Sequence, residues 1–82
     1  MSEECFKKLQ QIIKEIKPSV ESVNKDSDLG KDLAFDSLDT INFLFEVEKV
    51  FNIKIPESDI SENELVKINK IMKYIEKRVN NN

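Results

Sequence analysis

Apolar side chains recur three or four residues apart in long segments of this 82-residue chain, which is the spacing of an amphipathic helix. The segments with this period are residues 3–16, 37–51 and 65–79. Pro18 ends the first of them, because the residue before a proline disfavours helical geometry. Residues 57–61 have room for one short helical turn. The pattern predicts an all-α fold, a small four-helix bundle, in a single domain over residues 1–82.

A long polar connection, residues 17–36, lies between the first two predicted helices. Loops of this length without structure are uncommon in small domains and are often functional. Apolar residues interrupt the polar sequence, and we expect them to pack the connection against the core: Val20, Val23, Leu29 and Leu33.

The helix predicted over residues 37–51 carries two apolar stripes when its residues are placed about 100° apart. The broad stripe, which we expect to face the core, holds Phe43, Leu44, Val47, Val50 and Phe51. The narrow stripe holds Leu38, Ile41 and Phe45 and has polar or charged neighbours. We expect a bundle of this size to leave the narrow stripe partly exposed, as a docking surface. The alternative is that the long connection covers it.

Charge is distributed unevenly along the chain, whose net charge is −3. Residues 36–62 carry seven acidic and two basic groups, whereas residues 63–82 carry two acidic and five basic groups. An acidic segment disfavours nucleic acid and suits a partner with a basic surface. No apolar run reaches membrane-spanning length, and the N-terminus lacks the apolar core of a signal peptide. We therefore expect a cytoplasmic, monomeric protein that does not insert into membranes.

Several kinds of catalytic and metal site are excluded by composition. The chain has no histidine, which rules out Ser-His-Asp and Cys-His nucleophiles and zinc sites built on several Cys or His ligands. Gly30 is the only glycine, so no glycine-rich phosphate loop is present. Cys5 is the only cysteine, so no internal disulfide can form, and we interpret it as a part-buried, inert thiol.

Calcium binding has to be weighed because Asp26 and Asp28 have the spacing of the first ligands of an EF-hand loop. Counted from Asp26, the glycine falls at position five instead of six, and position twelve is Ser37 instead of glutamate. The pattern fails at both diagnostic positions. We predict no metal site, while weak surface binding of divalent cations remains open.

Ser37 stands at the predicted start of the second helix, between Asp36 and Asp39. Asp36 is a good N-cap, and Asp39 lies in the first turn, where an acidic residue is favourable. The simplest interpretation of such a serine is that it helps to start the helix. A helix N-terminus is also a suitable place for a phosphate group, because its backbone N–H groups and dipole favour negative charge. Both interpretations remain open at this point.

The stretch "DLAFDSLDTINFLFEVEKVFNIKIP" resembles the attachment motif, the recognition helix and the following Ile-x-Ile-Pro of the acyl carrier protein family. The resemblance extends over nearly the whole chain. It implies that Ser37 is the residue to which a phosphopantetheinyl transferase attaches 4′-phosphopantetheine from coenzyme A. The terminal thiol of that arm would carry an acyl group as a thioester, and Cys5 is not that thiol.

The resemblance also implies a function and partners. The chain would be a non-catalytic carrier that presents acyl intermediates to fatty-acid or related biosynthetic enzymes. Acyl-loading and acyl-processing enzymes with basic surfaces would dock on Asp36, Leu38, Asp39, Ile41, Phe45 and Glu48. Candidate linings of an acyl pocket between the helices are Phe43, Leu44, Val47, Ile55 and Ile71.

This sequence departs from the family pattern close to Ser37 and along the recognition helix. Ala34 and Phe35 stand where Gly-Ala is common, so we expect Phe35 to crowd the attachment site. Asn42 and Val50 stand where typical fatty-acid carriers have glutamate, and Lys49 dilutes the acidic face. These changes suggest a specialised carrier. Two alternatives are an aminoacyl, D-alanyl or peptidyl carrier of a dedicated pathway, and an unmodified acidic helical adaptor that docks through the narrow stripe.

Overall fold

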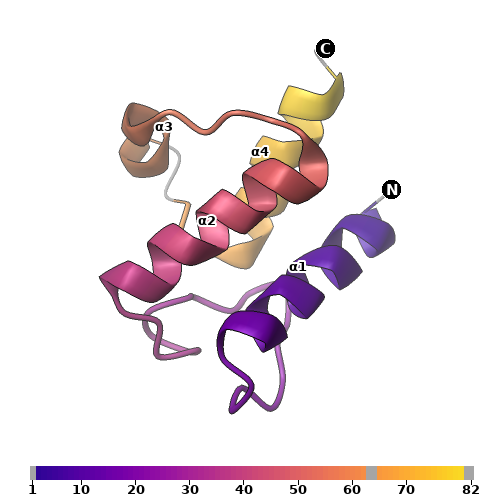
Figure 1. Ribbon diagram of the computed structural model, residues 1–82. Helices are drawn as coiled ribbons and strands as arrows, with labels where there is room; N and C mark the ends of the chain where they lie inside the picture. Colours follow the sequence, from indigo (N-terminus) through magenta and orange to yellow (C-terminus); the bar gives the residue numbers. More distant parts are fainter. Residues whose placement is uncertain (1, 63–64, 81–82) are drawn as a thin grey trace.

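The computed structural model describes residues 2–62 and 65–80, and these residues form four helices. In chain order the helices are α1 (Ser2–Ile16), α2 (Ser37–Phe51), α3 (Glu57–Glu62) and α4 (Ile68–Asn80) (Figure 1). Within the described ranges the only extended pairing outside the helices is one isolated bridge, between Asp28 and Lys67. The all-α prediction is confirmed.

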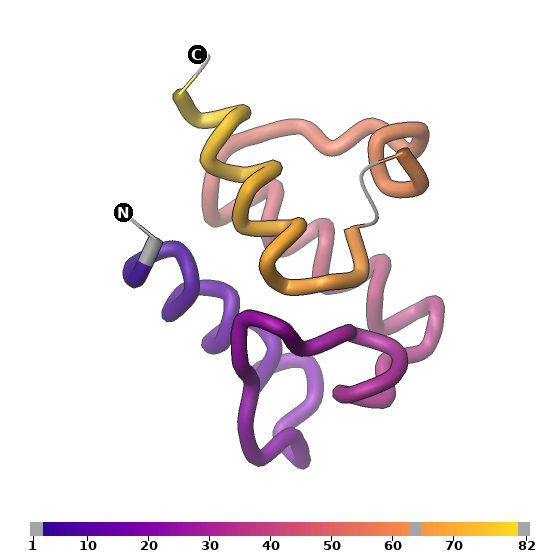
Figure 2. Tube along the Cα trace, turned by 180° about the vertical axis from the view of Figure 1, so that it is seen from behind, coloured from indigo at the N-terminus to yellow at the C-terminus, as the bar shows by residue number. Residues whose placement is uncertain are grey.

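The core lies between the three long helices, and α1 packs against both α2 and α4. Each long helix contributes apolar side chains to the core, but Val50, expected in the broad stripe that faces the core, is 45% exposed, so that expectation is wrong. The largest fully buried side chains are Leu9, Ile13, Leu29, Phe43, Val47, Leu65, Ile68, Ile71 and Ile75. The start of α1 and the end of α4 lie at the same end of the bundle (Figures 1 and 2). Helix α2 ends beside both and starts at the far end of the bundle (Figure 1), so its first residue, Ser37, lies opposite to them.

The long connection over residues 17–36 is packed onto the bundle as predicted. Val23, Leu29 and Leu33 are buried, and Val20 is half-buried against the core. Two backbone hydrogen bonds join the connection to the segment before α4. The N–H of Leu29 donates to the carbonyl of Val66 over 2.7 Å, and the N–H of Ile68 donates to the carbonyl of Ser27 over 3.0 Å. The long connection is thus held to the bundle both by its buried apolar side chains and by backbone hydrogen bonds.

The last helix begins at Ile68, so its predicted start at Leu65 is wrong. The reason is the pairing with the long connection, which uses the carbonyl of Val66 and the N–H of Ile68. Leu65 is fully buried although it lies before the helix. Its apolar side chain fits the helical spacing because it packs in the core, not because its backbone is helical. The other three helices differ from their predicted bounds by at most one residue.

Candidate functional site

The N-terminus of α2 is closed by two aspartates that cap each other's backbone. Asp36 has extended backbone angles (φ −91°, ψ −174°), and its side chain accepts a hydrogen bond from the N–H of Asp39 over 2.8 Å. The carboxylate of Asp39 in turn accepts from the N–H of Asp36 over 3.2 Å. This reciprocal arrangement is a capping box, which satisfies two of the N–H groups that a helix start leaves unpaired. The prediction of Asp36 as N-cap is confirmed.

Ser37 is the first residue of α2, and it is exposed. Its hydroxyl makes no hydrogen bond to any residue that the structure describes. Because Asp36 supplies the cap, the serine side chain is not needed to start the helix. The geometry thus leaves a nucleophilic oxygen in solvent beside the positive end of the α2 dipole.

Lys17 is a residue near this site that sequence reasoning missed. Its Nζ donates a hydrogen bond to the carbonyl of Ala34 over 2.5 Å and lies 3.6 Å from Oδ2 of Asp39. The same Nζ lies 5.9 Å from the centroid of the Phe35 ring. One lysine just after α1 therefore ties the end of the long connection to the first turn of α2. Nothing in the local sequence marks it, because its partners are distant along the chain.

Phe35 does not crowd the site, and the expectation that it would is wrong. Its side chain is buried, and its ring packs edge-to-face on Phe43 with centroids 6.2 Å apart and an 80° angle between the planes. Ala34, just before it, has a left-handed backbone (φ 58°), and the N–H of Phe35 donates to the carbonyl of Leu29 over 2.9 Å. The backbone thus turns the large ring into the core, where its burial is favourable.

The narrow stripe of α2 is exposed, as predicted, and the long connection does not cover it. Leu38 is 65% exposed, Ile41 48% and Phe45 57%. Large apolar side chains this exposed on consecutive turns of one helix are typical of a docking surface. The exposure is a finding, while docking on this face stays a prediction.

The carboxylates expected to flank this surface are largely engaged within the chain. Glu48 is half-buried, and its carboxylate accepts a hydrogen bond from the N–H of Ile55 over 2.7 Å. Asp39 faces Lys17, and Oε2 of Glu46 lies 3.3 Å from Nζ of Lys49. Glu48 therefore braces the connection that follows α2, a role that its spacing on the helix did not indicate.

Comparisons with known proteins agree with this geometry. A family model described as "phosphopantetheine attachment site" matches residues 7–75. A protein of Cyanidium caldarium named "Acyl carrier protein" is 36% identical over 80 residues, which cover 96% of this chain and 91% of that protein. One of Amoebophilus asiaticus with the same name is 34% identical over 79 residues, covering 96% of each chain. The chain belongs to the acyl carrier protein family. A Guillardia theta protein of this name is 41% identical over 56 residues, covering 67% of this chain and 69% of its own.

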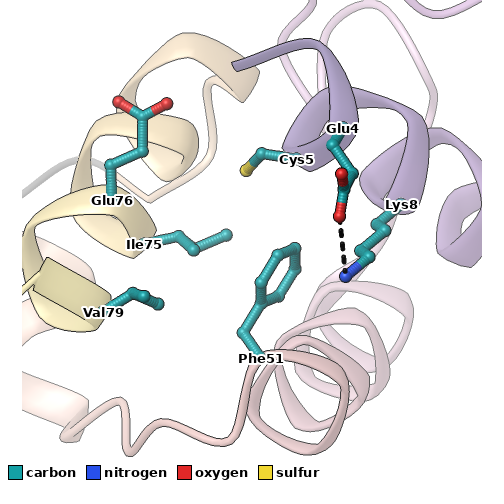
Figure 3. Close-up of a pocket in the computed structure, with 7 residues that line it drawn as sticks. All are labelled: Glu4, Cys5, Lys8, Phe51, Ile75, Glu76 and Val79. Atoms are coloured by element: carbon teal, nitrogen blue, oxygen red, sulfur yellow. Dashed lines mark ion pairs between the residues drawn. The ribbon is translucent and has the colours of Figure 1, made fainter. Parts of the chain in front are cut away.

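The five residues predicted to line an acyl pocket lie together in the core. Phe43, Leu44, Val47 and Ile71 are buried, and Ile55 is half-buried against them. A surface pocket of about 240 Å³ (Figure 3) lies elsewhere, between the start of α1 and the ends of α2 and α4, whereas Ser37 is at the start of α2. It is lined by Glu4, Cys5, Lys8, Phe51, Ile75, Glu76 and Val79. A role for the predicted five in sheltering cargo stays a prediction.

Cys5 forms part of that remote pocket and does not approach the site. Its side chain points from α1 toward α4, the helix that holds Ile75 (Figure 3), and it is only 6% exposed. Burial is the main cause that raises the pKa of its thiol above the usual value. A thiol that is buried and harder to ionise is less reactive, which agrees with the structural interpretation of this cysteine.

The loop with the partial EF-hand spacing uses the carboxylates of Asp28 and Asp32 to hold its own backbone. Oδ1 of Asp28 accepts from the N–H groups of Gly30 and Lys31 over 2.9 and 3.0 Å. These bonds, that of Lys31 above all, hold the pKa of Asp28 below its usual value. Among the residues that the structure describes, no group of three or more His, Cys, Asp or Glu is placed to hold a metal ion. None of the described helices is long and apolar enough to cross a membrane.

Proposed function

We propose that Ser37 carries 4′-phosphopantetheine as a phosphodiester and that the chain is a non-catalytic carrier of acyl groups. The observation that carries this proposal is the exposed Ser37 hydroxyl at the first residue of α2, inside the part of the chain that matches the phosphopantetheine attachment family. The capping box of Asp36 and Asp39 supports it, because it leaves the hydroxyl free of a structural task.

The residues around Ser37 fit a phosphodiester. The dipole of the 15-residue α2 favours negative charge at this end. The two neighbouring carboxylates each accept a backbone N–H, and Lys17 lies 3.6 Å from Asp39, which offsets part of their charge. When bound, the arm supplies a terminal thiol that holds the acyl group as a thioester. Cys5 cannot replace that thiol, because it is buried at the other end of the bundle.

The partners that follow from this proposal are a phosphopantetheinyl transferase and the enzymes that load and process the cargo. They would dock on the face of α2 that holds Asp36, Leu38, Asp39, Ile41 and Phe45, with Glu48 at its margin. An acyl cargo is supported over an aminoacyl, D-alanyl or peptidyl cargo by relatives whose printed name is "Acyl carrier protein". We further propose that residues 1–82 act as one carrier domain. A fatty-acid or related pathway and a cytoplasmic location stay predictions.

The test is arm attachment followed by intact mass spectrometry. The purified chain is incubated with a phosphopantetheinyl transferase and coenzyme A, and we expect its mass to increase by one arm. Ser37→Ala should show no increase, while Ser58→Ala, at another exposed serine on a helix, should be modified like the original chain. A modified Ser37→Ala variant would refute the assignment. An unmodified original chain would instead favour the adaptor alternative, in which partner binding is untouched by Ser37→Ala.

A further inference from the structure

The two ends of the long connection, residues 17–22 and 32–34, line a groove of about 340 Å³, which we call the connection groove. Its volume is within the range of small-molecule sites in proteins. Ala34, one of its lining residues, stands three residues before Ser37, so the chain between the two spans at most about 11 Å. The connection groove therefore lies within reach of a long group attached to Ser37.

The connection groove combines apolar surface with polar groups that the fold does not use. Val20 and Leu33 supply the apolar part of its lining. The side chains of Ser19, Glu21 and Ser22, which also line it, make no hydrogen bond or ion pair with any residue that the structure describes. The lining thus offers two hydroxyls and a carboxylate to a ligand that carries hydroxyl and amide groups.

Lys17 places a cation where the connection groove meets the first turn of α2. Its Nζ donates a hydrogen bond to the carbonyl of Ala34 and lies 3.6 Å from Oδ2 of Asp39. An ammonium group has three N–H donors, so at least one remains for a further acceptor. The Lys17 side chain is 29% exposed, which leaves it accessible to such an acceptor. A phosphodiester on Ser37, two residues before Asp39, would attract this cation.

The arm proposed for Ser37 has the length and the chemistry to enter the connection groove. From the serine oxygen to the thiol it is about fourteen bonds long, comparable to between four and five extended residues, or roughly 16 Å. It begins with a phosphodiester, continues with two methyl groups next to a hydroxyl, and then carries two amides. Each part has a counterpart in the lining, namely the Lys17 cation, the apolar residues Val20 and Leu33, and the polar groups of residues 19–22.

We propose that the arm without cargo lies in the connection groove, with its phosphodiester beside Lys17 and its methyl groups on Val20 and Leu33. This inference rests on the proposed function and adds where the arm lies when no enzyme holds it. Contacts between exposed charged groups each contribute little free energy, so the arm leaves the groove readily when an enzyme binds its thiol.

The experiment observes nuclear Overhauser effects between an unlabelled arm and an isotope-labelled chain. A phosphopantetheinyl transferase attaches the arm from ordinary coenzyme A, and isotope filtering selects contacts between arm and protein. We expect cross-peaks from the methyl groups of the arm to the side chains of Val20 and Leu33. Cross-peaks that reach only other parts of the chain, or no cross-peaks at all, overturn the proposal.

Substitution of Lys17 tests the cation separately. Lys17→Met keeps the length of the side chain and removes its charge. We expect the ratio of bound to free arm to fall by about two- to fivefold, the contribution of an exposed ion pair to an equilibrium, and the cross-peaks to weaken accordingly. Lys17→Arg keeps the charge and should retain them. Unchanged cross-peaks in Lys17→Met overturn the proposal.

Lys7→Met, at an exposed position of α1 outside the connection groove, controls for the loss of one positive charge and should leave the cross-peaks unchanged. Circular dichroism checks that each variant is folded. Failure of the proposed function would look different, because intact mass spectrometry would then show no arm on the original chain. An arm that is attached to Ser37 without contacts in the groove overturns this inference alone.

Discussion

Asp36 and Asp39 exchange two hydrogen bonds across the first turn of α2, directly around Ser37. Asp36→Ala removes the acceptor for the N–H of Asp39, and loss of an N-cap typically costs about 1 kcal/mol. We expect the free energy of unfolding, measured by urea denaturation, to fall by about that amount. Asp36→Asn keeps an acceptor and should lose at most a few tenths of a kcal/mol. Equal losses in the two variants would mean that the cap does not stabilise the helix.

The capping box also illustrates how much of this site could be predicted from sequence. Asp36 as N-cap and the exposure of Leu38, Ile41 and Phe45 follow from local rules, namely cap preference and helical period. These rules need only neighbouring residues. The three long helices were predictable for the same reason, since each carries a clear apolar stripe.

The features that the sequence did not predict correctly depend on contacts between distant parts of the chain. The start of α4 moved to Ile68 because residues 66 and 68 bond to the long connection, about 40 residues earlier. The ring of Phe35 is buried because it packs on Phe43. Lys17 contacts Ala34 and Asp39, which lie at the other end of the long connection. Period and composition carry no information about such pairings, so these contacts could only be read from the folded chain.

The left-handed backbone of Ala34 (φ 58°) predicts that glycine would be more stable at this position. A side chain at such an angle costs about 1–2 kcal/mol, and glycine avoids this cost. We expect Ala34→Gly to raise the free energy of unfolding by about 0.5–1 kcal/mol in urea denaturation, after allowing for the greater freedom of glycine in the unfolded chain.

Asn52 provides the comparison for this prediction, because it ends α2 with a similar backbone (φ 55°). Asparagine tolerates this conformation better than alanine does, so Asn52→Gly should gain less than Ala34→Gly. Asn52→Ala, measured in the same denaturation series, should lose stability. If Ala34→Gly instead destabilises the protein, the backbone at this position is not strained.

Phe35 and Phe45 provide a matched pair, since the same change is made at a buried and at an exposed ring. Phe35 is 7% exposed and Phe45 57% exposed. Phe35→Ala should lower the free energy of unfolding by about 3–4 kcal/mol, because it leaves a cavity beside Phe43. Phe45→Ala should change it by about 0.5 kcal/mol or less. Thermal denaturation followed by circular dichroism checks the order, and similar losses at both positions would contradict this assignment of core and surface.

Tyr74 joins α4 to α3, because its hydroxyl donates a hydrogen bond to Oδ2 of Asp59 over 2.6 Å. Burial above all, and then this bond, raises the pKa of Tyr74 to about 12. Tyr74 is the only tyrosine, so the ultraviolet absorbance of tyrosinate reports on it alone. We expect its titration midpoint to lie well above the value of about 10 found in the chain unfolded by urea.

The same shift makes stability depend on pH in a defined direction. The folded state holds the proton of Tyr74 more tightly than the unfolded state does, so its contribution is complete below about pH 10. It is lost as the pH rises toward the folded-state pKa of about 12. Tyr74→Phe removes this titration and one hydrogen bond, so we expect it to be less stable by about 1 kcal/mol near pH 7. The difference from the original chain should shrink above pH 10 in urea denaturation, and a difference that stays constant would show that the Tyr74 hydroxyl ionises alike in both states.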